Sequence, residues 1–156
     1  MPNFEDVNQK KVVGSLEVVG AQGPVLVKRI EYTAILAALT SASVTLATFK
    51  PGDTIIDVMV VPTTAVGAAC TVDIGVDATF DGASGDADAF INDADLNATT
   101  AVRMTTATPP TAGIAGAKCA ADGGAVKIIS SANRSATTAF RGYIDIVYIA
   151  STKTSY

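Results

Sequence analysis

The chain has 156 residues, a formal net charge of −4 and 49% hydrophobic residues. This length suits one domain with a real core, and the hydrophobic content excludes a disordered acidic chain. The acidic balance gives no electrostatic footprint for nucleic acid, and the complete absence of histidine excludes a Ser-His-Asp or Cys-His catalytic site.

Residues 1–24 read as an N-terminal arm followed by a first short strand. The arm is polar and carries Lys10 and Lys11, and residues 12–19 (VVGSLEVV) have the composition of a short strand before a turn over residues 21–24. No signal-peptide pattern is present, and no stretch approaches the roughly 20 apolar residues that span a bilayer. We therefore expect a soluble protein that does not contact membranes. Residues 1–11 are expected to become ordered against a neighbouring subunit or a larger assembly, with a disordered tail as the alternative.

Residues 25–150 carry strand patterns separated by turn signals, and residues 151–156 form a polar tail. The first pattern predicts a strand over residues 25–35, with a helix over residues 31–39 as the alternative. A turn at Lys50-Pro51-Gly52-Asp53 is expected, because Pro sets a turn φ and Gly supplies a positive one. The other predicted strands cover residues 43–48, 54–61 (ended by Pro62), 70–76, 88–92, 99–106, 126–130 and 139–149.

This succession of about eight short strands predicts an all-β protein. We expect a single-domain antiparallel β-sandwich of jelly-roll type. An immunoglobulin-like sandwich is the alternative, but it lacks its usual Cys-Trp-Cys marks because Trp is absent. Cys70 and Cys119 are interpreted as small buried thiols, with one disulfide between them as the alternative.

An acidic stretch over residues 71–97 holds seven of the fifteen acidic side chains. Asp93 and Asp95 are spaced like the first ligands of an EF-hand loop, but the sixth position is Ala and the twelfth is Met, where Gly and Glu are needed. Asp86 and Asp88 lie in one nonapeptide that resembles a calcium-binding repeat, and such repeats must stack. Calcium at these four aspartates is therefore kept only as an alternative to turn formation, and no cofactor is expected.

Enzyme chemistry finds no residues to carry it. The paired aspartates could formally act as a glycosidase pair, but such clefts rely on aromatic platforms and the chain has no Trp. Residues 122–125 (DGGA) lack the Lys-Ser or Lys-Thr of a phosphate-binding loop and are predicted to form a hairpin turn. We therefore expect no catalytic residues and a protein that is not an enzyme.

Charge is distributed unevenly along the chain. No Lys or Arg lies between residues 51 and 102, whereas residues 103–156 are rich in them. Pairing of the acidic segment of one copy with the basic segment of the next would hold a homo-oligomer that weakens as salt rises. The residues expected at contacts between subunits or with a larger assembly are Lys10, Lys11, Asp77, Asp81, Lys118, Lys127, Arg134 and Arg141.

Several phrases resemble small structural proteins of tailed-bacteriophage virions. They are Thr-Val-Asp-Ile-Gly over residues 71–75, DADAFINDADLNA over residues 86–98, and Lys-Pro-Gly-Asp-Thr over residues 50–54 before an apolar strand. The resemblance covers residues 49–149. It implies a β-sandwich or jelly-roll protein at the capsid surface of the virion, where a homotrimer binds the major capsid protein as a decoration or cement protein. A head spike, a tail-associated component or a module that binds host glycans is the alternative.

Overall fold

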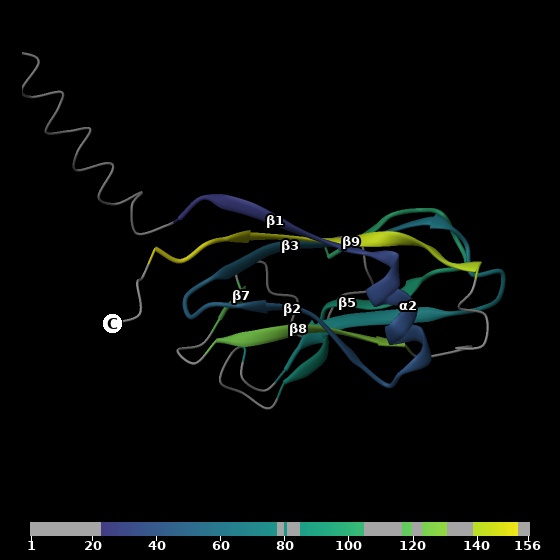
Figure 1. The fold of residues 1–156 in the computed structure, drawn as a ribbon, viewed down its shortest axis with the longest axis horizontal. Coiled ribbons are helices and arrows are strands. Elements are labelled where there is room, and N and C mark those ends of the chain that lie inside the picture. The colour runs from purple at the N-terminus through teal and green to yellow at the C-terminus, as the bar shows by residue number, and fades with distance from the viewer. Residues whose placement is uncertain are drawn as a thin grey trace, which may run out of the picture.

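Two antiparallel β-sheets stack face to face in the computed structural model, which describes residues 23–77, 80, 85–104, 117–119, 123–130 and 139–152 (Figure 1). The predicted all-β sandwich is thus confirmed. The larger sheet has the order β1 (Val25–Glu31), β9 (Arg141–Ile149), β3 (Thr54–Thr64) and β6 (Val102–Arg103), and β7 (Ala117–Lys118) also pairs with β3. The smaller sheet has the order β2 (Val44–Phe49), β8 (Gly124–Ser130), β4 (Thr71–Val76) and β5 (Asp86–Asp95).

The strand order is that of a jelly roll. When the two-residue β7 is left out, the first, eighth, third and sixth strands form one sheet, and the second, seventh, fourth and fifth form the other. Successive strands from β1 to β4 therefore alternate between the sheets, as two nested Greek keys require. This topology brings β1 and β9, from opposite ends of the described chain, side by side in full register from Val25↔Ile149 to Glu31↔Tyr143.

Period-2 alternation builds the core between the sheets. Val72 and Ile74 of β4, and Ile144 and Ile146 of β9, are fully buried, because alternate side chains of a strand point to the same face. Aromatic rings link the layers edge to face: Phe49 contacts Tyr148 at 5.1 Å and Phe80 at 6.1 Å, and Phe80 contacts Phe90 at 6.4 Å between ring centroids.

The predicted strand over residues 25–35 is wrong beyond Glu31, and the helical alternative is correct. Helix α2 (Tyr32–Thr40) follows β1 directly and lies between the two sheets on the side where β1 and β2 are the edge strands (Figure 1). Ile35, Ala38 and Leu39 are spaced three and four residues apart and are all buried. Its N-cap residue makes no side-chain capping bond, so burial of this apolar face is what stabilises so short a helix.

Several strand boundaries also differ from the prediction. Pro62 does not end β3, which continues to Thr64, because a register shift between Pro62 and Thr64 accommodates the missing N–H. β5 runs from Asp86 to Asp95, longer than predicted, since it pairs with β4 through two register shifts. Only Val102–Arg103 is a strand within described residues 99–104.

The predicted hairpin at residues 122–125 is likewise wrong, because the strands on either side, β7 and β8, belong to different sheets. The predicted turn at residues 50–53 is confirmed, with φ of +85° at Gly52 and a hydrogen bond from the Asp53 N–H to the Lys50 carbonyl. Cys70 and Cys119 are buried and not joined in a disulfide, as expected. The described part of the chain contains no helix with the length and apolar content that a bilayer crossing requires.

Candidate interaction surface

Strand β1 exposes more apolar surface than any other described strand. Val25, Leu26 and Val27 have 60%, 40% and 58% of their surface exposed, and they are the large hydrophobic residues most open to solvent among those described. Their antiparallel partners include Val147 and Ile149 of β9, which are half-buried. Val25, Val27, Val147 and Ile149 thus form one apolar patch on the outer face of the larger sheet, which we call the β1 patch.

β1 also leaves backbone groups unpaired at the sheet edge. Within the described residues it pairs only with β9. The Ala150 N–H donates to the Pro24 carbonyl at 3.1 Å, so residues 24 and 150 are a hydrogen-bonded pair. Hydrogen-bonded and non-hydrogen-bonded pairs alternate along an antiparallel ladder. The N–H and C=O groups of Val25, Val27, Arg29 and Glu31 therefore point away from β9, toward the open edge.

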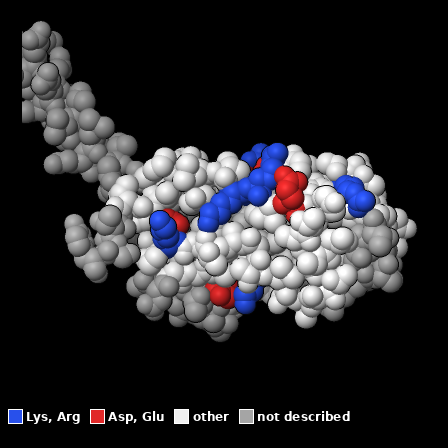
Figure 2. Space-filling view, in the orientation of Figure 1, with Lys and Arg blue, Asp and Glu red and all other residues white. Residues whose placement is uncertain are grey.

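Basic side chains next to the patch are held over aromatic rings. The Arg29 guanidinium lies 3.8 Å from the Tyr143 ring centroid and donates two hydrogen bonds of 2.7 Å to the buried carboxylate of Asp145, which raises the pKa of Arg29. The Lys28 ammonium lies 4.2 Å from the Phe49 centroid and donates to the Thr48 carbonyl of β2. Figure 2 shows basic side chains, with acidic ones beside them, on a face that is otherwise largely uncharged. The bonds hold β1 rigidly on the sandwich.

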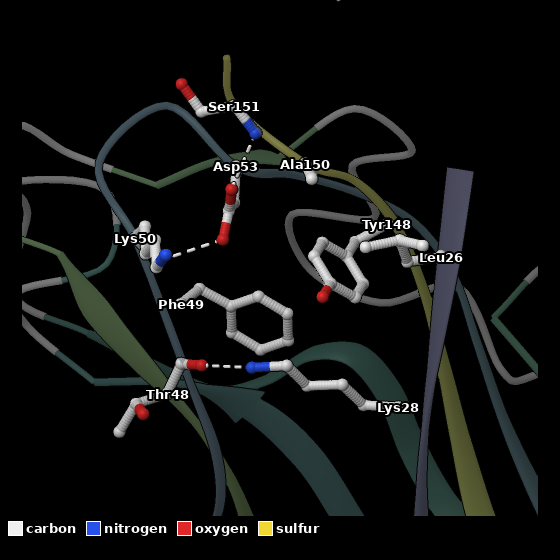
Figure 3. Close-up of a pocket in the computed structure, with 9 residues that line it drawn as sticks. All are labelled: Leu26, Lys28, Thr48, Phe49, Lys50, Asp53, Tyr148, Ala150 and Ser151. Carbon is white, nitrogen blue, oxygen red and sulfur yellow. Dashed lines mark hydrogen bonds between the residues drawn. The ribbon is translucent and has the colours of Figure 1, made fainter. Parts of the chain in front are cut away.

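A hollow of about 370 Å³ lies between the starts of β1 and β3 and the ends of β2 and β9 (Figure 3). Leu26, Lys28, Phe49 and Tyr148 line one side. Asp53 lines the other, and both of its carboxylate oxygens accept backbone hydrogen bonds, from Lys50 N at 2.8 Å and Ser151 N at 2.7 Å. Because Asp53 is fully engaged, the hollow presents aromatic edges and lysine ammonium groups, which suit an aromatic or acidic side chain of a partner.

The four calcium candidates do not converge on one ligand site. Asp86 accepts a hydrogen bond from the Asp88 N–H at the start of β5, and Asp95 accepts one of 2.8 Å from the Asn97 N–H in the turn after β5, so both carboxylates bond to nearby backbone. Asp93 donates its N–H to Asp73 at 2.8 Å and has a positive φ of 55°. Within the described ranges, no three His, Cys, Asp or Glu side chains are placed to hold a metal ion.

Asp73, which sequence reasoning placed on the exposed face of its strand, is half-buried. Burial raises its pKa, the hydrogen bond from the Asp93 N–H lowers it, and the Asp93 and Asp88 carboxylates raise it further. The net shift is upward. The outer face of β4 and β5 is therefore a patch of mutually repelling carboxylates.

The predicted contact residues are scattered over the molecule. Lys10, Lys11, Asp81 and Arg134 lie outside the described residues, and so does the side chain of Lys118. Asp77 accepts a hydrogen bond from the Ala125 N–H at 3.1 Å, which ties the end of β4 to β8. Arg141 lies 4.9 Å from the Tyr32 ring centroid, and Lys127 sits half-buried on β8. Their role between subunits stays a prediction.

Sequence reasoning missed the β1 patch and the hollow. The run Val25-Leu26-Val27 was visible, but a continuous apolar run predicts burial on both faces rather than exposure at an edge.

Comparison with known protein families, with curated proteins and with solved structures found no match to the chain.

Proposed function

We propose that this chain is a non-enzymatic structural protein of a tailed-bacteriophage virion that binds and stabilises the capsid surface. The observation that carries the proposal is the β1 patch, an apolar surface on the rigid outer face of a jelly roll. Isolated exposed hydrophobic residues are ordinary on proteins, but a contiguous apolar patch indicates a binding surface. The resemblance of residues 49–149 to virion proteins supplies the kind of partner, the major capsid protein.

The electrostatic arrangement around the patch supports attachment rather than catalysis. Arg29 and Asp145 are paired with each other, and the Lys28 ammonium is held on the Thr48 carbonyl of β2, so both basic side chains beside the patch have fixed positions. Removing the side chains of Val25 and Val27 from water would contribute about 1 kcal/mol each, since each is 58–60% exposed. Each copy would bind weakly, and the many equivalent copies on a capsid would together stabilise the capsid shell.

We propose a homotrimer as the binding unit, because capsid lattices offer three-fold positions to a closed cyclic assembly. The open edge of β1 supports self-association, since unpaired strand edges readily bind another strand.

The test begins with purified virions of the phage that encodes the chain. Mass spectrometry and imaging should find copies on the order of hundreds per particle, distributed over the head, as symmetry-related capsid positions require. A protein found in a few copies at the tail or on a spike would refute capsid decoration in favour of the receptor-binding or tail alternative.

A matched pair of full-length variants then tests the surface. Val27→Asp places a charge in the β1 patch, and Thr45→Asp places the same charge on exposed β2 of the opposite sheet. Both should fold, but only Val27→Asp should fail to cosediment with capsids that lack the protein. Equal binding by the two variants would show that the patch is not the attachment surface.

A further inference from the structure

We infer that the hollow between the starts of β1 and β3 and the ends of β2 and β9 binds a small aromatic carboxylate. The inference stands whether or not the protein decorates a capsid, because it concerns a site within one copy of the chain. It is carried by three features of the lining residues: a fixed ammonium group, one net positive charge and an apolar wall (Figure 3).

The Lys28 ammonium provides a fixed anchor for an anion. It lies 4.2 Å from the Phe49 ring centroid and 5.5 Å from the Tyr148 ring centroid, and it donates a hydrogen bond to the Thr48 carbonyl. A lysine ammonium has three donors, so two remain for a ligand. Because the aromatic rings and the carbonyl already hold Lys28 in place, binding an anion costs this side chain little further conformational entropy.

The charges around the hollow favour a ligand with a single negative charge. Lys28 and Lys50 contribute two positive charges, and Asp53 is the one acidic residue among the described residues of the lining. Neither lysine forms an ion pair with a described carboxylate. The sum is one positive charge, which a carboxylate neutralises, whereas a phosphate dianion would leave an excess negative charge near Asp53. A cation would be repelled by both lysines.

The arrangement of the lining places the bound carboxylate at the Lys28 end of the hollow. Figure 3 shows the Lys28 ammonium on one side of the Phe49 ring and Asp53 on the other. Both Asp53 oxygens accept backbone hydrogen bonds, from Lys50 N and Ser151 N, and so are directed away from a ligand. A carboxylate bonded to Lys28 is thus separated from Asp53 by the Phe49 ring.

An apolar wall suits the aromatic body of the ligand. Leu26, Phe49, Tyr148 and Ala150 line the hollow, and the Phe49 and Tyr148 rings meet edge to face at 5.1 Å between centroids. A ligand ring can extend this edge-to-face arrangement. Leu26 is 40% exposed, so a bound ring would also remove apolar surface from water. The volume of about 370 Å³ lies within the range of small-molecule sites, about 300–1,000 Å³.

Titration of the isotope-labelled, full-length protein with phenylacetate, followed by NMR, tests the inference. Phenylacetate should shift the amide signals of Lys28, Phe49 and Tyr148 and saturate with a Kd on the order of 1 mM, as expected for a ligand of about ten non-hydrogen atoms. Phenylacetamide has nearly the same shape but no charge, and it should bind roughly 10-fold more weakly or less. Phenyl phosphate, mostly a dianion above pH 7, should bind no more tightly than phenylacetate.

Matched charge variants complete the test. Lys28→Gln removes the anchoring ammonium and should weaken phenylacetate binding roughly 10-fold or more. Lys127→Gln removes the same charge from β8, outside the hollow, and should leave binding unchanged. Lys50→Gln alters an exposed side chain that the fold does not need, and it should weaken binding roughly 3-fold even if Lys28→Gln fails to fold.

Four results would overturn the inference. They are the absence of saturable shifts with phenylacetate, equal binding of phenylacetate and phenylacetamide, tighter binding of phenyl phosphate, and phenylacetate binding that is unchanged in both Lys28→Gln and Lys50→Gln. The second would mean that the hollow takes any apolar ring, and the third that it is a phosphate site.

Discussion

Replacing Asp53 should loosen the junction where β3 begins and β9 ends. Asp53 is only 4% exposed, and its carboxylate accepts hydrogen bonds from the N–H groups of Lys50 and Ser151, which are far apart in the sequence. Asp53→Ala removes both acceptors. The carboxylate thus joins the turn after β2 to the chain segment that follows β9, next to the hollow (Figure 3).

The magnitude follows from the two bonds. Hydrogen bonds to a charged group contribute about 1.5–3 kcal/mol each to the free energy of unfolding. The lower value applies here, because water can reach the Lys50 and Ser151 amides once the Asp53 side chain is gone. The two bonds together then give a loss of about 3 kcal/mol. For a chain of this size, each kcal/mol lowers Tm by about 2–4 °C, giving a decrease of about 6–12 °C. Asp53→Asn keeps one acceptor oxygen and should lose about half as much.

Urea unfolding followed by circular dichroism measures the loss. Asp95→Ala is the matched control, because Asp95 is exposed and accepts a single hydrogen bond, from the Asn97 N–H within its own turn. The control should change the free energy of unfolding by about 0.5 kcal/mol or less. If Asp53→Ala were no more destabilising than Asp95→Ala, the carboxylate would not join the two segments and the reasoning would be refuted.

Three further predictions concern the acidic face, a thiol and two glycines. The folded pKa of Asp73 is raised above its unfolded value, so its contribution to stability is full below the unfolded pKa and is lost as pH rises through the folded pKa. Asp73→Asn should therefore be slightly more stable than wild type at pH 7 in thermal melts, and the difference should vanish near pH 3. A pH-independent difference would contradict this. Burial, with the nearby carboxylates of Asp53 and Asp77, raises the pKa of the Cys119 thiol to about 11. Ellman's reagent at pH 8 should therefore label this thiol only after denaturation. Rapid labelling of the native protein would be inconsistent with its burial. Gly75→Ala should lower the free energy of unfolding in urea by several kcal/mol, because its Cβ would come within 1.9 Å of the Asp86 carbonyl oxygen. The control Gly67→Ala meets no atom within 4 Å and should cost only about 1 kcal/mol for its positive φ. Equal losses would show that the β5 backbone moves away from the added methyl group.

Local sequence signals were sufficient for the strands whose two faces differ. The alternation Ile144-Asp145-Ile146 places two isoleucines in the core and leaves Asp145 on the outer face, where Arg29 pairs with it. The turn at residues 50–53 was equally predictable, since Pro and Gly restrict φ through their own covalent structure. In both cases the determining interactions lie within a few residues along the chain.

The segment after Glu31 shows where local signals were ambiguous. Residues 32–40 carry both β-compatible residues and the apolar spacing of a short helix, and their helical propensity alone would not stabilise nine residues. The helix forms because the gap between the sheets is open beside the edge strands β1 and β2, where Ile35, Ala38 and Leu39 become buried. Pro62 is similar, since a register shift beside β9 allows a proline inside a strand that the sequence alone would end there.

The sequence by itself determined an all-β chain with about eight strands, buried thiols and turn-forming aspartates, because side-chain period and turn chemistry act over short distances. Only the tertiary structure decided which strands are neighbours, and therefore which apolar run stays exposed. Val25, Leu26 and Val27 resemble core residues in the sequence, but the jelly-roll order places β1 at the edge of its sheet. Pairing with β9, more than 100 residues away in the chain, is a non-local interaction that no window of sequence reveals.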